Sequence, residues 1–147
     1  AEIENLLAHC EVAPALIQVE CHPYFPQTQL KALLAKHDIA LQAWYPLGGR
    51  DNKSILEEPA ILELAAKHGK TAAQIIMRWH VQQDNIVIPG SKTPAHILDN
   101  IDIFDFELDE QDMHAIAGLE QGKPLYERTP DKIAFYATWH PDVENQK

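Results

Sequence analysis

The chain has 147 residues, of which 46% are hydrophobic and 23% are charged, so it can bury a core and is not disordered. Its net charge of -10 and the lack of clustered lysine and arginine exclude a nucleic-acid surface or an anionic membrane surface. No stretch is long and apolar enough to span a membrane, and the first five residues lack the features of a signal peptide.

The cysteines and histidines argue against a metal site. Cys10 and Cys21 have no metal-type spacing, and we interpret both as reduced thiols of a cytoplasmic protein. The histidines are scattered, with no pair at helical spacing and no H-E-x-x-H motif. The chain starts without Met in an amphipathic pattern, so we expect it to begin within a longer chain.

Helices and short apolar strands alternate along the first third of the chain. Apolar residues at helical spacing predict a helix that starts at Ile3, fades towards Val12 and stops before Pro14, and a second helix that contains residues 30–34 and ends near His37. Between them, residues 16–21 predict a strand whose alternation places Gln18 and Glu20 on one face. In a covered strand such side chains are either hydrogen-bonded internally or face a polar cavity. Residues 39–45 predict the second strand, which ends at the P-L-G-G of residues 46–49.

The middle of the chain is helical. The polar residues 50–54 predict a surface loop of the kind that closes over a site. Pro59 and Gly69 bound a third helix, and a capping box of Thr71 and Gln74 begins a fourth that ends near residue 83. Asp109 with Asp112 begins a further helix, and from residue 122 onward the pattern dissolves into a tail.

Residues 86–100 combine a strand, a tight turn and a helix start. The run I-V-I at 86–88, closed by Pro-Gly, predicts a parallel strand covered on both faces. Thr93 is a suitable N-cap and Pro94 suits the first helical position. Free backbone N–H groups at this helix start, beside Ser91 and Lys92, would bind an anion. The alternative is an ordinary strand-to-helix loop.

Three parallel strands alternating with helices indicate an α/β architecture. An open doubly wound sheet and part of a (β/α)8 barrel both fit this order. No G-x-G-x-x-G follows a strand, whereas the polar and aromatic residues follow the carboxyl ends of strands, as in barrels. A full barrel needs about 250 residues, so we predict a portion with three of the eight strands.

Four ordered blocks resemble one known family. They are Q-V-E-C-H-P-Y at 18–24, A-W-Y-P-L-G at 43–48, I-P-G-S at 88–91, and Asn100 followed by I-F-D-F-E-L at 103–108. These blocks are similar to the C-terminal half of an aldo-keto reductase. The resemblance implies the C-terminal portion of a (β/α)8 TIM barrel over residues 1–121, a substrate-specificity tail over 122–147, and an NADPH or NADH cofactor.

The resemblance also implies roles at the nicotinamide end. Gln18 would hydrogen-bond the carboxamide, the alternative being a satisfied buried amide. Trp44 would stack on the nicotinamide ring, the alternative being a core tryptophan. Leu47 would lie against the pyrophosphate. Glu20 and His22 are interpreted as structural, holding strand ends by hydrogen bonds.

At the adenosine end, the resemblance assigns Ser91, Asp99 and Asn100 to cofactor binding. Gly90 and His96 depart from the family pattern, because they replace the Lys and Arg that clamp the 2′-phosphate in NADPH-preferring members. Histidine is mostly uncharged near neutrality and lacks the guanidinium fork. We therefore expect weaker selectivity for NADPH and some use of NADH, with Lys92 restoring part of the charge.

The family reduces aldehydes and ketones to alcohols by hydride transfer, with a Tyr, Lys, Asp and His that belong to its N-terminal half. No residue here matches those motifs, so we expect these 147 residues not to catalyse the reaction unaided. The alternative is a fragment that binds nucleotide or self-associates without catalysis. In the tail, Phe135, Tyr136 and Trp139 are candidates for the wall of the substrate site, or else belong to an exposed tail.

Overall fold

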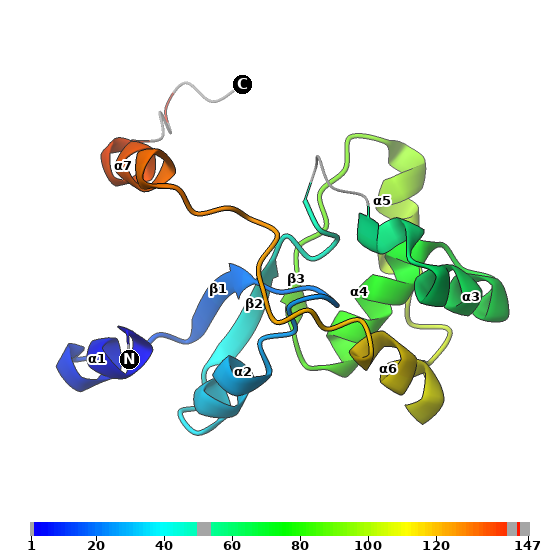
Figure 1. Cartoon of the computed structure of the whole chain (residues 1–147), viewed down its shortest axis with the longest axis horizontal. Helices are drawn as coiled ribbons and strands as arrows, with labels where there is room; N and C mark the ends of the chain where they lie inside the picture. The colour runs from blue at the N-terminus through cyan, green and yellow to red at the C-terminus, as the bar shows by residue number, and fades with distance from the viewer. Residues whose placement is uncertain (1, 50–53, 141–143, 145–147) are drawn as a thin grey trace.

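A parallel sheet of three strands, in the order β1-β2-β3, lies at the centre of the chain (Figure 1). The computed structural model describes residues 2–49, 54–140 and 144. In chain order the elements are α1 (Glu2–His9), β1 (Leu16–Glu20), α2 (Thr28–Ala35), β2 (Ala40–Trp44), the 3-10 helix η1 (Ser54–Glu57), α3 (Pro59–His68), α4 (Ala72–Gln82), β3 (Ile86–Val87), α5 (Pro94–Ile101), α6 (Glu110–Ala117) and α7 (Pro130–Thr138). The alternation of helices and strands predicted up to residue 117 is confirmed. Of the predicted closing loop, residues 50–53 lie outside the described residues, and Ser54 begins η1.

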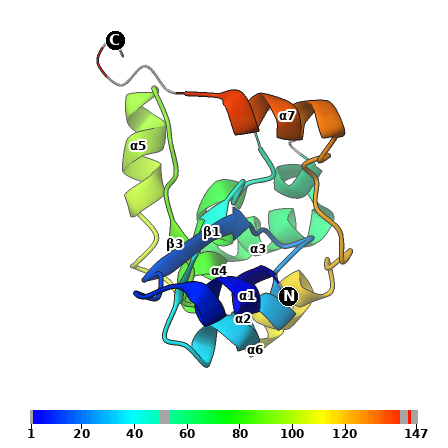
Figure 2. The same cartoon turned by 90° about the vertical axis from the view of Figure 1, so that its left-hand side faces the viewer.

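Helices cover one face of the sheet. In the register, Gln18 lies opposite Gln42 and Glu20 opposite Trp44, so the alternation places these four side chains on a common face. The other face packs against α1 and α2 (Figure 2). The apolar residues joined there are Ile3, Leu7, Ile17, Val19, Leu30, Leu34, Ile39, Leu41, Ala43 and Val87, together with Cys21.

Strand β3 corrects one prediction. The apolar run at 86–88 is not covered on both faces, because Ile86 is 41% exposed and Ile88 is 62% exposed. Ile86 lies opposite Gln42 and therefore on the face away from α1 and α2. An apolar run is typical of a strand with two covered faces. The described part of the chain supplies a cover for only one of them.

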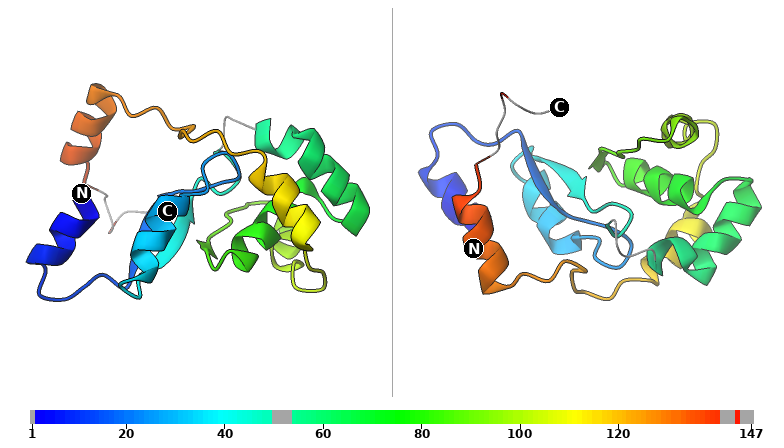
Figure 3. Two further views of the ribbon diagram at one scale, coloured as in Figure 1. Left: turned by 60° about the horizontal axis from the view of Figure 1, so that its bottom comes forward. Right: turned by 90° about the horizontal axis from the view of Figure 1, so that it is seen from above.

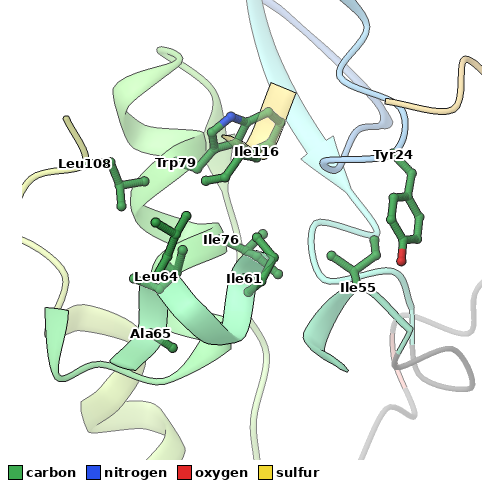
Figure 4. Packing of buried hydrophobic residues seen from close by; sticks show 10 residues of the cluster. Tyr24, Ile55, Ile61, Leu64, Ala65, Ile76, Trp79, Leu108 and Ile116 are labelled. Atoms are coloured by element: carbon green, nitrogen blue, oxygen red, sulfur yellow. The ribbon is translucent and has the colours of Figure 1, made fainter. Parts of the chain in front are cut away.

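A second apolar cluster joins α3, α4, α6 and η1 (Figure 4). Figure 3 shows these helices on one side of the chain, with α1 and α7 on the other. The predicted capping box of Thr71 and Gln74 is present, and Asp109 and Asp112, which were predicted to begin α6, form a second one. The buried residues of the cluster are Tyr24, Ile55, Ile61, Leu64, Ala65, Ile75, Ile76, Trp79, Leu108 and Ile116.

The tail corrects a second prediction. The region from residue 122 onward is not wholly irregular, because it contains α7, which Thr129 caps by accepting from the Lys132 N–H at 3.3 Å. Pro130 occupies the first turn of this helix, where its missing N–H costs nothing. Figures 1 and 2 place α7 apart from α1 and α2. Among the described residues, no helix has both the length and the apolar character to cross a membrane.

Replacing Ile61 by Ala should lower the free energy of unfolding by about 2 to 4 kcal/mol, because the side chain is completely buried and its loss leaves a cavity. Urea denaturation measures the change. Leu62→Ala, on the same helix but with Leu62 48% exposed, is the matched control and should cost less than about 1 kcal/mol. Equal losses in the two variants would contradict this description of the core.

Candidate functional site

A groove lies where the segments after β2 and β3 approach each other, and we call it the strand-end groove. Its volume is about 620 Å³, a size suited to a small-molecule ligand. It brings together six of the predicted cofactor-binding residues from two separate segments of the chain. These are Leu47, Gly90, Ser91, His96, Asp99 and Asn100.

The turn after β2 shapes one side of this groove. Tyr45 has a left-handed backbone with φ of 57°, so the chain turns sharply before Pro46. The Tyr45 ring lies over Gly49, where an added Cβ would clash with Cε1 of the ring. A residue with a side chain therefore does not fit at position 49 without moving Tyr45. Leu47 beyond the turn packs against the larger apolar cluster.

The segment between β3 and α5 forms the other side. Pro94 is in the first turn of α5 as predicted, but the Thr93 side chain makes no capping hydrogen bond. Instead, Ser91 Oγ accepts from the Thr93 backbone N–H at 3.1 Å. Thr93 is thus the N-cap residue as predicted, although its side chain accepts no capping hydrogen bond. Lys92 is exposed and does not line the groove.

A second groove lies between the end of the sheet and α7, and we call it the tail groove. Its volume is about 640 Å³. It brings together the predicted residues Gln18, Trp44, Tyr136 and Trp139, which come from three separate segments. Phe135 does not line it, and its ring contacts the ring of Tyr136 at 5.4 Å between centroids. The roles of all of these residues stay predictions.

Polar and aromatic side chains from β1 and β2 line the base of the tail groove. Gln18 is exposed, and its Nε2 donates to Gln42 Oε1 at 2.7 Å, so it is not the buried amide of the alternative interpretation. Trp44 is half-buried and therefore not a core residue. Its ring lies 4.0 Å from the Tyr45 ring and 5.0 Å from the Tyr126 ring, measured between centroids. These contacts hold the indole in one orientation.

Glu20 joins the sheet to the tail. Its Oε1 accepts from the backbone N–H of Leu125 at 2.6 Å and of Tyr126 at 3.0 Å, and from His22 Nε2 at 3.0 Å. Burial lowers the pKa of His22, while the Glu20 carboxylate acts in the opposite direction. The structural role predicted for Glu20 and His22 is confirmed by these hydrogen bonds. Because the tail is tied at this point, the segment that follows lies beside Trp44.

A buried histidine holds the turn after β2. His80 of α4 donates from Nε2 to the Pro46 carbonyl at 3.3 Å, and its Nδ1 accepts from Asn85 Nδ2 at 3.1 Å. The acceptor role of Nδ1 requires the neutral ring. Burial lowers the pKa of His80 to about 3, which keeps it neutral. The strand-end groove thus depends on a neutral imidazole beneath Pro46.

Several lining residues were not singled out from the sequence. Gln42, which lines neither groove but accepts from Gln18 at the edge of the tail groove, had a readable signal, because it alternates with Trp44 on the second strand. No local sequence signal pointed to the tail-groove residues Tyr126, Arg128 and Lys132. The Glu20 hydrogen bonds that place the tail span about a hundred residues of sequence.

Known proteins are similar to this chain in sequence and in fold. The sequence pattern of the aldo/keto reductase family matches residues 1–121. The chain belongs to the aldo-keto reductase family. It is 47% identical over 136 residues to an aldo-keto reductase of Mycolicibacterium smegmatis, which covers 92% of this chain and 47% of the relative. It is 42% identical over 123 residues to the methylglyoxal reductase DkgA of Escherichia coli K12, covering 84% of this chain and 44% of that protein.

Solved aldo-keto reductase structures show the same arrangement. An aldo/keto reductase of Brucella melitensis superimposes with a TM-score of 0.74 at 48% identity, over 81% of this chain and 44% of that chain. A metagenomic aldo-keto reductase from the Medee basin superimposes with a TM-score of 0.81 at 35% identity, over 85% of this chain and 46% of that chain. A mutant of Gox0644 in complex with NADPH superimposes with a TM-score of 0.74 at 39% identity, over 80% of this chain and 42% of that chain. The three strands are therefore part of a (β/α)8 barrel, and this aldo-keto reductase chain spans about half the length of its relatives.

Glu20→Ala should release the tail of this aldo-keto reductase chain, because the Leu125 and Tyr126 N–H groups lose their acceptor. We expect hydrogen–deuterium exchange of the Leu125 and Tyr126 amides to accelerate by at least about tenfold, the equivalent of one charge-assisted hydrogen bond. Glu127→Ala is the control, because that exposed side chain takes no part in the hydrogen bonds between Glu20 and the tail. Unchanged exchange in Glu20→Ala would show that Glu20 does not hold the tail.

The neutral His80 predicts a pH dependence of stability. Between about pH 6.5 and 3 the unfolded chain binds a proton at His80 that the folded chain excludes, so stability falls as the pH falls. His80 contributes up to about 1.4 kcal/mol per pH unit to this slope. His80→Gln should remove that contribution from urea denaturation measured between pH 6.5 and 4.5. The exposed His114→Gln should leave the slope unchanged; the same slope in wild type and His80→Gln would contradict the assignment.

Proposed function

We propose that this chain binds NADPH or NADH and forms the cofactor-binding side of a carbonyl reductase. The observation that supports it is the convergence of six predicted cofactor-binding residues on the strand-end groove. The predicted nicotinamide residues Gln18 and Trp44 meet in the tail groove instead. Two grooves at the ends of adjacent strands suit a cofactor bound in an extended pose, as the family resemblance implies.

The donors at the nicotinamide end fit a carboxamide. In the Gln18–Gln42 pair, one amide N–H is used and a carbonyl oxygen and further N–H groups remain for a ligand. A carboxamide requires both an acceptor and a donor, and this pair offers both. The half-buried face of Trp44 offers a flat apolar surface for the ring.

The adenosine end has the open backbone that a phosphate requires. A Cβ at Gly90 would meet nothing within 4 Å, so this backbone is open to a ligand. Ser91, with Asp99 and Asn100, supplies polar groups in the same groove. Among the described residues that line it there is no lysine or arginine, so His96 is the candidate partner for a 2′-phosphate.

The bound cofactor would supply a hydride to the carbonyl carbon of an aldehyde or ketone, whose oxygen takes up a proton. The Escherichia coli relative is a methylglyoxal reductase, which supports a small carbonyl substrate for this chain. We assign residues 1–121 to the barrel and 122–147 to the substrate-specificity tail. We assign the proton donor to no residue of this chain, and expect turnover to require the other strands of a barrel.

A second candidate function is cofactor binding with self-association and without catalysis. The exposed Leu16 and Ile86 on the uncovered sheet face support it, because apolar residues on open strands favour association.

We place the protein in the cytoplasm, since Cys10 and Cys21 are unpaired thiols and burial raises the pKa of Cys21 to about 11.

Titrating the chain with NADPH and NADH while following tryptophan fluorescence tests the proposal. We expect both to bind, with NADPH preferred by less than about a hundredfold, since a larger ratio needs nearly 3 kcal/mol of phosphate contact. His96→Arg should raise the preference for NADPH by roughly tenfold, because a guanidinium adds a permanent charge and a bidentate fork. Light scattering then separates the two candidate functions, because a stable monomer that binds the cofactor would contradict self-association.

His114→Arg adds the same charge on α6, outside both grooves, and is the matched control. Its NADPH preference should equal that of the wild type. If neither cofactor binds, the proposed function is wrong. If the two arginine variants behave alike, His96 does not face the 2′-phosphate.

A further inference from the structure

The tail groove is positively charged in an acidic protein. Among the described residues, its lining includes Arg128 and Lys132 and no acidic side chain, although the chain as a whole has a net charge of -10. A concave site with one sign of charge attracts the opposite sign more strongly than a flat surface does. This local reversal of charge points to an anionic ligand group.

The two cations differ in how they are held. Lys132 Nζ donates to the Glu127 carbonyl at 2.9 Å and lies 4.7 Å from the centre of the Tyr126 ring, so its charge is held against the groove wall. Arg128 has no ion-pair or hydrogen-bond partner among the described residues. Its planar fork is therefore available to a carboxylate, which it matches in a bidentate geometry.

The other residues that line the tail groove favour a ligand with an apolar portion. Trp44, Tyr126, Tyr136 and Trp139 contribute rings from the sheet, the tied tail and α7. Rings of this kind bury flat apolar surface and also interact with cations beside them. The groove thus combines an aromatic lining with a cationic edge.

We propose that the tail groove selects a carbonyl substrate that carries a carboxylate on an apolar or aromatic body, with Arg128 as the specificity-determining residue and Lys132 as its support. This inference rests on the proposed function, because it places the substrate beside the nicotinamide residues Gln18 and Trp44. The hydrogen bonds of Glu20 to the tail place Arg128 at this position, because they hold the neighbouring residues 125 and 126.

The anion that Arg128 binds could come from the substrate or from the pyrophosphate of the cofactor. Phenylglyoxylate and its neutral methyl ester separate these sources, because the ester keeps the carbonyl and the ring but loses the charge. NMR titrations of the full chain, followed through the indole N–H signals of Trp44 and Trp139, report binding in the groove itself. The same variants are titrated separately with NADPH.

We expect phenylglyoxylate to bind at least roughly fivefold more tightly than the ester, as for a partly exposed charge pair. Arg128→Gln should bring the ratio close to one without changing the affinity for the ester or for NADPH. Arg128→Lys should retain part of the preference. Lys123→Gln removes a positive charge from the same tail outside the groove and should behave as wild type.

A charged-to-neutral ratio that Arg128→Gln leaves unchanged overturns the inference, as does the absence of phenylglyoxylate binding. Weaker NADPH binding in Arg128→Gln, with an unaltered ratio, overturns it in favour of the pyrophosphate. Each of these results leaves NADPH binding by the wild type intact, whereas failure of the proposed function abolishes it. Arg128 is exposed on an irregular segment, and thermal unfolding verifies that its variants fold.

Discussion

In the described part of the chain, helices pack on only one face of the parallel sheet, and the candidate site follows from that constraint. Strand alternation separates an apolar set, which packs under α1 and α2, from a set that includes Gln18, Gln42 and Trp44. In a complete barrel the second set faces the interior and the carboxyl-end mouth, where ligands bind. The same alternation leaves Ile86 exposed here. The residues predicted to contact the cofactor and the exposed apolar residues of the strands therefore share one face of the sheet.

The buried Glu20 carboxylate extends this arrangement to the tail. It satisfies two backbone N–H groups and a histidine, and so offsets the cost of its own burial with three hydrogen bonds. Residues 125 and 126 are thereby placed at the end of β1, and the chain beyond them forms one side of the tail groove. The tail segment that we propose selects the substrate and the strands that we propose hold the cofactor are thus linked through one side chain.

The elements that were predictable from the sequence are those determined by local contacts. The capping boxes at Thr71 and Asp109 and the shared face of Gln18 and Glu20 depend only on residues close in sequence. The helix at 130–138 also had a readable start in Thr129 and Pro130, which was missed because no apolar periodicity followed it. By contrast, the tail groove depends on Glu20 meeting Leu125, which no local pattern encodes. The exposure of Ile88 likewise depends on which strands and helices lie beside it.

A crystal structure of the chain with NADPH tests the central claim, that the uncovered sheet face and the strand ends bind the cofactor. The account predicts the nicotinamide ring on Trp44, with its carboxamide at Gln18, and the adenosine end in the strand-end groove between Gly90 and Asn100. A cofactor bound elsewhere, or one whose nicotinamide does not contact Trp44, would contradict it.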